Sequence, residues 1–137
     1  MKLFAIYIGG EHPKAHIEVH DVRFVVAETI RDTYDQLRAE WWGTPGTLHI
    51  DCWAEIDHVD GHDVTLQPER APVRDKLFFV NLGGYDGREF AERHRNLFVV
   101  ATSIPRRRHG RWRPFRTGPT RIGTTCTTRT TSSRSTA

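Results

Sequence analysis

Apolar residues gather along this chain in several short segments, some continuous and some alternating with polar positions, and both patterns are typical of β-strands. Residues 3–8 form an apolar run that ends at a pair of glycines, and residues 77–82 form a second run before a second pair. Residues 17–27 and 48–56 contain alternating apolar positions and many β-branched side chains, which is typical of strands. The turn signal Asp60-Gly61 precedes a short fourth strand, predicted at residues 63–66.

A helical period replaces this alternation in residues 29–42. Apolar side chains lie three or four positions apart there and share one face of a helix: Ile30, Tyr34, Leu37 and Trp41. Thr29 is the predicted N-terminal cap, with Asp32 three residues later as its partner in a capping box. Gly43 predicts the end of the helix.

The strongest pattern is an internal repeat. Residues 2–30 recur without a gap at residues 76–104, so that adding 74 to a position in the first copy gives its counterpart in the second. Identical residues occupy 12 of the 29 aligned positions, far more than chance gives. The unit of strand, loop, strand, helix, strand and strand is therefore expected to begin again at Lys76.

These elements predict an α+β fold in which a helix packs across a sheet of three or four strands. The arrangement resembles the ubiquitin-like β-grasp roll, so we expect two tandem ubiquitin-like (β-grasp-like) repeats. The first repeat is predicted at residues 1–66, a linker at 67–75, and a truncated second repeat at 76–104. The second repeat is incomplete because Pro105 and the arginines after it replace the apolar face of its helix.

Charge is divided unevenly between the body and the tail. The formal net charge of +3 comes from residues 105–137, which contain nine arginines and no acid. Residues 1–104 contain 11 Lys and Arg against 17 Asp and Glu, a net charge of −6. Binding to a phosphate backbone needs a positive face, so we expect the body to bind no nucleic acid.

The tail at residues 105–137 has too few apolar residues to offset the entropy of ordering it, and is predicted to be disordered. It is either a basic arm or the product of a shifted reading frame. Residues 118–137 can be back-translated so that the neighbouring frame encodes WTDPHRDDLYDADDVFALD, which has the composition of a globular domain. We favour the frameshift.

Several phrases of the chain resemble a known family. The segments LFAIYIGG, HIEVHDVRFVVAETI and LHID, followed by LFFVNLGGYD and FAERHRNLFVVA, are similar to the bacterial domain of unknown function 1543 family, whose members often contain two such repeats. The back-translated PHRDDLYD resembles that family's second-repeat ending. The resemblance covers residues 1–104 and implies no activity, because the family is uncharacterised.

The main candidate chemistry lies in two pairs, Glu18 with His20 and Glu92 with His94. Residues two apart on a strand face the same side, so each pair can act together as acid, base or metal ligand. Packing of the repeats about a pseudo-twofold axis would bring both pairs together, as a donor set that suits Zn, Fe or Mn. The structural alternative is that these side chains cap loops or bond backbone groups.

The glycine pairs do not form a phosphate loop, because the spacing G-x-G-x-x-G and a following Lys-Ser/Thr pair are both missing. Paired glycines after a strand instead favour a tight turn. The acidic loop at residues 57–63 suits a cation but is more simply an exposed turn, and the remaining histidines, His49 among them, are predicted to be solvated. The candidate binding residues are Gly9, Gly10, Glu18, His20, Asp21, Gly83, Gly84, Glu92 and His94.

Two classes of function stay open. We favour a binding module that presents the groove between the repeats to a small ligand or a protein, a second copy of the chain included. The alternative is a small metal-dependent enzyme that uses Glu18, His20, Glu92 and His94; the sequence identifies no cofactor. The N-terminal segment is too short for a signal or membrane segment, so a cytoplasmic protein without a membrane partner is expected.

Overall fold

The computed structural model describes residues 1–68 and 74–103, together with the backbone of residues 125–127. The chain divides into two compact units, Met1–Asp57 and a second unit that begins at His58. Strands predominate and one short α-helix accompanies them, which confirms the predicted α+β class. None of the helices in the described part of the chain has the length and apolar character needed to cross a membrane.

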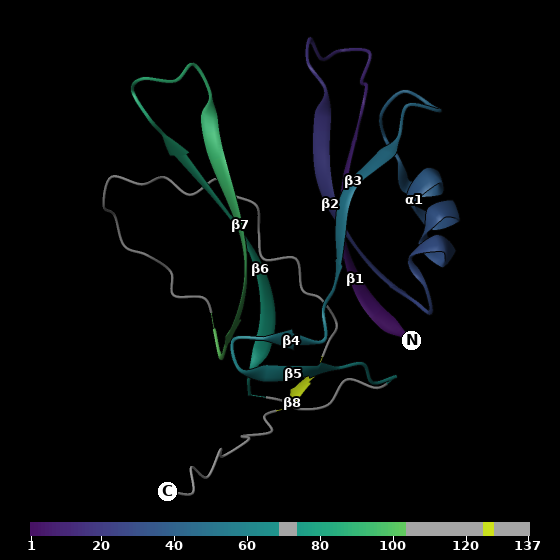
Figure 1. Cartoon of the computed structure of the whole chain (residues 1–137), viewed down its shortest axis with the longest axis vertical. Coiled ribbons are helices and arrows are strands. Elements are labelled where there is room, and N and C mark those ends of the chain that lie inside the picture. Colours follow the sequence, from purple (N-terminus) through teal and green to yellow (C-terminus); the bar gives the residue numbers. More distant parts are fainter. Residues whose placement is uncertain (69–73, 104–124, 128–137) are drawn as a thin grey trace, which may run out of the picture. The chain divides into compact units, whose positions relative to one another are not determined.

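The first unit is built on a three-stranded antiparallel sheet (Figure 1). Its strands are β1 (Lys2–Gly10), β2 (Val19–Ala27) and β3 (His49–Glu55), in the order β2-β1-β3. These match the three strands predicted for this part of the chain. Because β1 lies in the centre, its residues have a cross-strand neighbour on both sides.

The helical segment begins as predicted but ends earlier. A 3₁₀ turn at Ile30–Thr33 leads into α1 (Tyr34–Glu40). The carboxylate of Asp32 accepts hydrogen bonds from the backbone N–H and the hydroxyl of Thr29, each at 2.8 Å, so the predicted capping box is present. Trp41 has extended backbone angles and closes the helix before Gly43.

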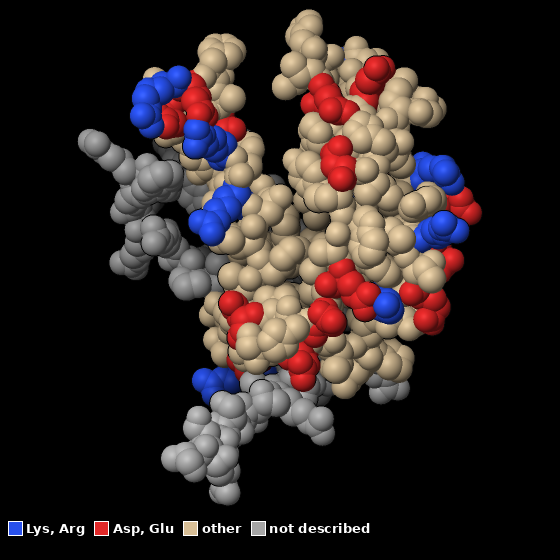
Figure 2. Space-filling model, in the orientation of Figure 1, with Lys and Arg blue, Asp and Glu red and all other residues tan. Residues whose placement is uncertain are grey.

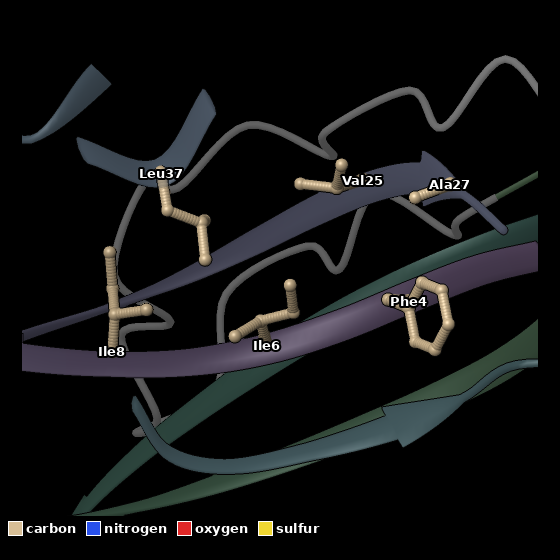
Figure 3. Close-up of a cluster of buried hydrophobic side chains, with 6 residues drawn as sticks. All are labelled: Phe4, Ile6, Ile8, Val25, Ala27 and Leu37. Carbon is tan, nitrogen blue, oxygen red and sulfur yellow. The ribbon is translucent and has the colours of Figure 1, made fainter. Parts of the chain in front are cut away.

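The core of the first unit lies between α1 and one face of the sheet. Alternate residues of β1 point to this face and meet two residues of β2 and one of α1 (Figure 3). Leu37 is the helical member and is 2% exposed. The buried cluster consists of Phe4, Ile6, Ile8, Val25, Ala27 and Leu37. The opposite face of β1, which carries Tyr7 and Gly9, is thereby left for other contacts.

The glycine pairs are not turns, and that prediction was wrong. Gly9 and Gly10 are the last residues of β1, and Gly83 and Gly84 lie within β6 (Lys76–Tyr85). Among the described glycines, positive φ angles occur at Gly46 and Gly61 instead. The reason for glycine at the ends of β1 and β6 is therefore close approach by other groups, not backbone curvature.

The second unit contains a hairpin that copies the first hairpin in register. In β1 and β2, Lys2 pairs with Ala27; in β6 and β7 (Glu92–Ala101), Lys76 pairs with Ala101, which is the same pair with 74 added to each number. The same offset holds along both ladders. The second unit also contains a small sheet in the order β4-β5-β8, whose strands are His58–Val59, His62–Thr65 and Thr125–Thr127.

The division between the two compact units falls after Asp57, so β4 and β5 cluster with the second unit. The predicted limits of the first repeat, the linker and the second repeat stay predictions. The turn predicted between β4 and β5 is present, with positive φ at Asp60 and Gly61. Residues 69–73 of the predicted linker, and the tail apart from residues 125–127, lie outside the described residues, so the predicted disorder stays a prediction.

Candidate metal-binding site

Two histidines flank Gly9 across the central strand. In the antiparallel register, Gly9 pairs with His20 of β2 on one side and with His49 of β3 on the other. Directly opposed residues in neighbouring strands project to the same face of a sheet. Both imidazoles therefore stand on the face opposite α1, one on each side of a residue that has no side chain.

Two carboxylates complete the cluster: Glu18 lies directly before β2, and Asp51 lies within β3. Glu18 precedes His20 by two positions, and Asp51 follows His49 by two. Asp51 is the extra residue of a β-bulge, because Ile8 pairs with Ile50 whereas Tyr7 pairs with Cys52. The bulge turns the Asp51 side chain toward the two imidazoles.

The four side chains form a closed ring of contacts. Nε2 of His49 lies 3.0 Å from Oε1 of Glu18 and 3.2 Å from Oδ1 of Asp51. Nε2 of His20 lies 3.5 Å from Oε2 of Glu18 and 3.5 Å from Oδ2 of Asp51. Each carboxylate thus directs one oxygen to each ring, and we refer to Glu18, His20, His49 and Asp51 as the four-residue cluster.

Gly9 provides the room for this cluster. A Cβ atom at position 9 would lie 2.9 Å from Nε2 of His49, 3.0 Å from Cδ2 of His20 and 3.1 Å from Oδ2 of Asp51. Any other residue would push these side chains outward. The neighbouring Gly10 serves the other face, where a Cβ would lie 2.6 Å from the Trp41 ring.

The backbone holds His49 in one tautomer. Nδ1 of His49 lies 3.2 Å from the carbonyl oxygen of Thr47, which can only accept a hydrogen bond, so Nδ1 carries a proton. In the neutral ring, Nε2 then has a lone pair and lies beside two carboxylate oxygens. A cation between Nε2 and the two carboxylates relieves that repulsion.

A loop locked to the end of β1 sets the position of Thr47. The Glu11 backbone N–H donates to the Thr47 hydroxyl at 3.0 Å, and that hydroxyl donates to the carbonyl of Thr44 at 2.8 Å. The Trp41 indole N–H donates to the same carbonyl at 3.1 Å. Histidines that bind metals commonly donate their second ring N–H to a backbone carbonyl in this way.

Tyr7 supports the other imidazole. Its ring stacks on that of His20, with centroids 5.4 Å apart and planes 17° apart. Burial raises the pKa of the Tyr7 phenol, and the negative charges of Asp51 and Cys52 act in the same direction. The phenol therefore stays neutral beside the carboxylates.

The surroundings of the cluster are acidic and accessible. Residues 1–57 contain five Lys and Arg against ten Asp and Glu, and acidic side chains are visible over the described surface (Figure 2). The side chains of the cluster are between 34% and 45% exposed. Within the described residues, however, no group of three or more His, Cys, Asp and Glu side chains is placed so that it could hold a metal ion.

A pocket of about 310 Å³ lies between α1 and β3. His49 is one of its lining residues, although its imidazole belongs to the cluster on the face of the sheet opposite α1. Its lining combines apolar, aromatic and charged groups: Tyr34, Leu37, Arg38, Leu48, His49 and Ile50.

The structure brings together three of the predicted site residues in the first unit: Gly9, Glu18 and His20. Gly10 faces Trp41 and Thr47 and lies outside the cluster. Asp21 lies on the opposite face of β2, where it accepts hydrogen bonds from the Val22 backbone N–H at 2.7 Å and from Arg23 at 2.5 Å.

In the second unit, Gly83, Glu92 and His94 repeat the arrangement of Gly9, Glu18 and His20. His94 pairs with Gly83 across the hairpin and lies 3.4 Å from Glu92. Gly84 pairs with Arg93 and lies outside this group. Since the two pairs lie in different units, their predicted meeting stays a prediction.

Sequence reasoning missed His49 and Asp51. We expected His49 to be solvated, yet its ring lies against both carboxylates of the cluster. A signal was present: His49 and Asp51 have the same two-residue spacing as Glu18 and His20. What the sequence did not disclose was that β3 pairs with β1 at Gly9.

The acidic loop at residues 57–63 contributes structural contacts. Asp63 lies 3.1 Å from Nδ1 of His58, and Asp60 accepts a hydrogen bond from the Val100 backbone N–H at 3.1 Å. These contacts account for two of its carboxylates without a cation.

Comparison with known proteins gives a family and a solved relative. Residues 15–66, which include all four donors of the cluster, match the family described as Domain of Unknown Function (DUF1543). The chain is also similar to the protein Il1583 from Idiomarina loihiensis, whose crystal structure is known, with 42% sequence identity and a TM-score of 0.61. The similarity covers 74% of this chain and 64% of that chain, which is less than two thirds of the relative. No curated protein matches the chain.

Proposed function

Residues 15–66 belong to the DUF1543 family, and from this premise we propose that the domain is a metal-binding module whose four-residue cluster binds one divalent transition-metal ion. Two imidazole nitrogens and two carboxylate oxygens form a donor set that suits Zn²⁺ and is also accepted by Mn²⁺ and Fe²⁺. The donors are Glu18, His20, His49 and Asp51.

The observation that carries the proposal is the spacing of the donor atoms. Four ligands placed ~2 Å from a tetrahedral ion lie about 3.3 Å from one another. The nitrogen-to-oxygen distances in the cluster run from 3.0 to 3.5 Å. Closure around one ion requires each carboxylate to turn so that one of its oxygens faces both imidazoles. These side chains are partly exposed, so such rotations meet little resistance.

Electrostatics supports the same conclusion. With neutral imidazoles the cluster carries two negative charges, and the Thr47 carbonyl fixes the His49 tautomer in which Nε2 has a lone pair. A divalent ion neutralises both carboxylates and accepts both lone pairs.

The structural alternative explains less. Exposed ion pairs of this kind contribute about 0 to 1 kcal/mol each. Glycine inside a strand costs about 0.5 to 1 kcal/mol relative to alanine. A glycine in the central strand that only makes room for surface ion pairs therefore yields little net stability. Room for metal ligands would instead serve metal binding.

Isothermal titration tests the proposal. The full chain is freed of metal with a chelator and titrated with Zn²⁺, and the metal content after dialysis is measured by mass spectrometry. We expect one ion per chain, and a loss of affinity of at least tenfold in His20→Ala and in His49→Ala.

His94→Ala is the matched control, because it removes the equivalent histidine of the second hairpin, which lies outside the four-residue cluster. It should leave the affinity for Zn²⁺ unchanged. Wild-type affinity in His20→Ala and His49→Ala, or no binding by the wild type, overturns the proposal. Ca²⁺ and Mg²⁺ should bind far more weakly, because hard cations prefer oxygen ligands.

A second candidate, a small metal-dependent enzyme, is favoured by the pocket that shares His49 with the cluster. A ligand held there would lie on the helix side of β3, with Arg38 available for an anionic group. The enzyme that we predicted from Glu18, His20, Glu92 and His94 needs both units, whereas this version needs only the first. Arg38→Ala should then lower turnover of an anionic substrate and leave Zn²⁺ affinity intact.

The finer architecture, two tandem ubiquitin-like repeats of which the second is incomplete, is also a proposal. It is supported by the common register of the hairpins β1-β2 and β6-β7. A groove between the repeats, a protein partner and self-association stay predictions.

A further inference from the structure

The pocket on the helix side of the first unit lies between α1 and the edge strand β3 (Figure 1). The buried core cluster takes its side chains from α1, β1 and β2. Leu48 and Ile50, which come from the β3 side, pack against this cluster and stay half-buried. The pocket of about 310 Å³ therefore opens where the helix does not cover the outermost strand, and every residue that lines it belongs to one compact unit.

Its lining has an apolar floor and a polar rim. Leu37 is buried, and it forms the floor together with Leu48 and Ile50. Tyr34 and Arg38 stand one helical turn apart on α1, are both exposed, and form the rim. A ligand can thus bury an apolar body against the floor while a polar end stays at the rim, which is the usual arrangement of a small-molecule site.

Arg38 determines which polar group fits the rim. Its Nη1 donates a hydrogen bond to Oδ1 of Asp35 at 3.0 Å, and its guanidinium carbon lies 5.9 Å from the centre of the Tyr34 ring. The Asp35 side chain is fully exposed, so this ion pair is weak. A guanidinium has five N–H donors in a planar fork that matches the two oxygens of a carboxylate. A bound carboxylate can therefore replace Asp35 or share the guanidinium with it.

Size and charge narrow the ligand class further. A water molecule occupies ~30 Å³ of the liquid, so a pocket of about 310 Å³ has room for about ten heavy atoms. Residues 1–57 contain five Lys and Arg against ten Asp and Glu, and the resulting negative potential opposes multiply charged anions such as nucleotides and sugar phosphates. A single negative charge placed against Arg38 meets much less of that repulsion.

We propose that this pocket binds a small monocarboxylate with a compact apolar body, of the size of an aromatic acid. The apolar body packs on the floor of the pocket, and the carboxylate pairs with Arg38. The site is separate from the four-residue cluster, because the imidazoles of His20 and His49 lie on the other face of the sheet. Binding therefore requires no metal ion and does not depend on the proposed function.

Benzoate is the probe, and benzamide, which has nearly the same size and shape but no charge, is its neutral counterpart. The full chain is kept free of metal with a chelator and titrated with each compound, and binding is followed by the NMR chemical shifts of the backbone amides. We expect benzoate to bind with a Kd of about 1 mM, as an efficient ligand with so few heavy atoms does. It should shift the signals of Leu37, Leu48 and Ile50, and should bind at least about fivefold more tightly than benzamide.

Three variants test the role of the rim. Arg38→Gln should weaken benzoate binding at least about fivefold and leave benzamide binding unchanged. Asp35→Asn, which removes the competing carboxylate, should strengthen benzoate binding about twofold. Arg31→Gln is the matched control, because Arg31 is an exposed cation of the preceding 3₁₀ turn and lies outside the pocket lining; it should bind benzoate as the wild type does.

The proposal is overturned by equal affinities for benzoate and benzamide, or by equal affinities of Arg38→Gln and the wild type for benzoate. Signal shifts confined to residues outside the pocket overturn it as well, and so does the absence of benzoate binding. Because the protein is free of metal in every titration, none of these results bears on Zn²⁺ binding by the four-residue cluster.

Discussion

The Gly9→Ala variant should weaken Zn²⁺ binding at the proposed site and leave the stability of the fold nearly unchanged. The new methyl carbon would lie 2.9 to 3.1 Å from three groups of the cluster, on His49, His20 and Asp51. Carbon atoms normally stay about 3.5 to 4.0 Å from non-bonded neighbours. Each group therefore has to retreat by about half an ångström or more, and away from the position between the imidazoles.

The two consequences differ in size. All three neighbours are ends of side chains, so the sheet itself need not move, and alanine in a strand recovers about 0.5 to 1 kcal/mol relative to glycine. The free energy of unfolding should thus stay within about 1 kcal/mol of wild type. Mutation of the groups that support metal ligands commonly lowers metal affinity by about 10 to 100-fold. We expect a loss of Zn²⁺ affinity in that range, about 1.4 to 2.7 kcal/mol.

The assay compares urea unfolding without metal and Zn²⁺ titration for each variant. Gly10→Ala is the comparison for stability and not for affinity, because its methyl would meet the Trp41 ring at 2.6 Å and the backbone carbonyl of Thr47, the acceptor of His49 Nδ1, at 3.0 Å. Such overpacking should lower stability by about 1 to 3 kcal/mol. If Gly9→Ala binds Zn²⁺ as tightly as the wild type, the cluster does not hold the metal between its two imidazoles.

Three further predictions concern the scaffold. Leu37→Ala should lower the free energy of unfolding by about 2 to 5 kcal/mol, seen as a lower urea midpoint, because it empties a site in the core between α1 and the sheet; a midpoint shift of under 1 kcal/mol would contradict that packing. Asp32→Ala should cost about 0.5 to 2 kcal/mol by loss of the cap on Thr29, and Asp35→Ala, at an exposed carboxylate of α1, is its control. The pKa of Tyr7 is raised in the folded state, so its contribution to stability is complete below the ordinary phenol pKa and is lost as the pH rises through the folded value. Wild type should therefore lose stability relative to Tyr7→Phe in urea titrations above pH ~10, and parallel pH profiles of the two proteins would contradict the shift.

Local patterns predicted the parts of the site that lie within one strand or one hairpin. The Glu18-x-His20 spacing placed both side chains on one face because a strand alternates with a period of two. The repeat then predicted the same pair in the second hairpin. Thr29 and Asp32 predicted the start of the helical segment for a similar reason, since a capping box is a contact over three residues.

The parts that failed depend on pairings between distant segments. The sequence contains no local sign that β3 lies beside β1, or that Asp51 occupies a bulge there, so His49 was predicted to be solvated. Gly9 was misread for the same reason. A glycine pair after an apolar run suits a turn and a close approach equally well, and the choice depends on which side chains arrive from other strands.

Gly9 and Gly10 together show how one strand links the core to the cluster. Gly10 allows Trp41 to close against β1, and the Trp41 indole fixes the loop through the Thr44 carbonyl. The same loop presents the carbonyl of Thr47 to Nδ1 of His49. Nε2 then has the lone pair, and it faces the space above Gly9. The packing on the helix side therefore influences which ring nitrogen of His49, on the opposite side, carries the proton. Each of these contacts is made to the backbone or to a ring that the backbone holds. The orientation of the His49 ring is therefore set before any ion binds. Such preorganisation favours selective binding at an exposed site.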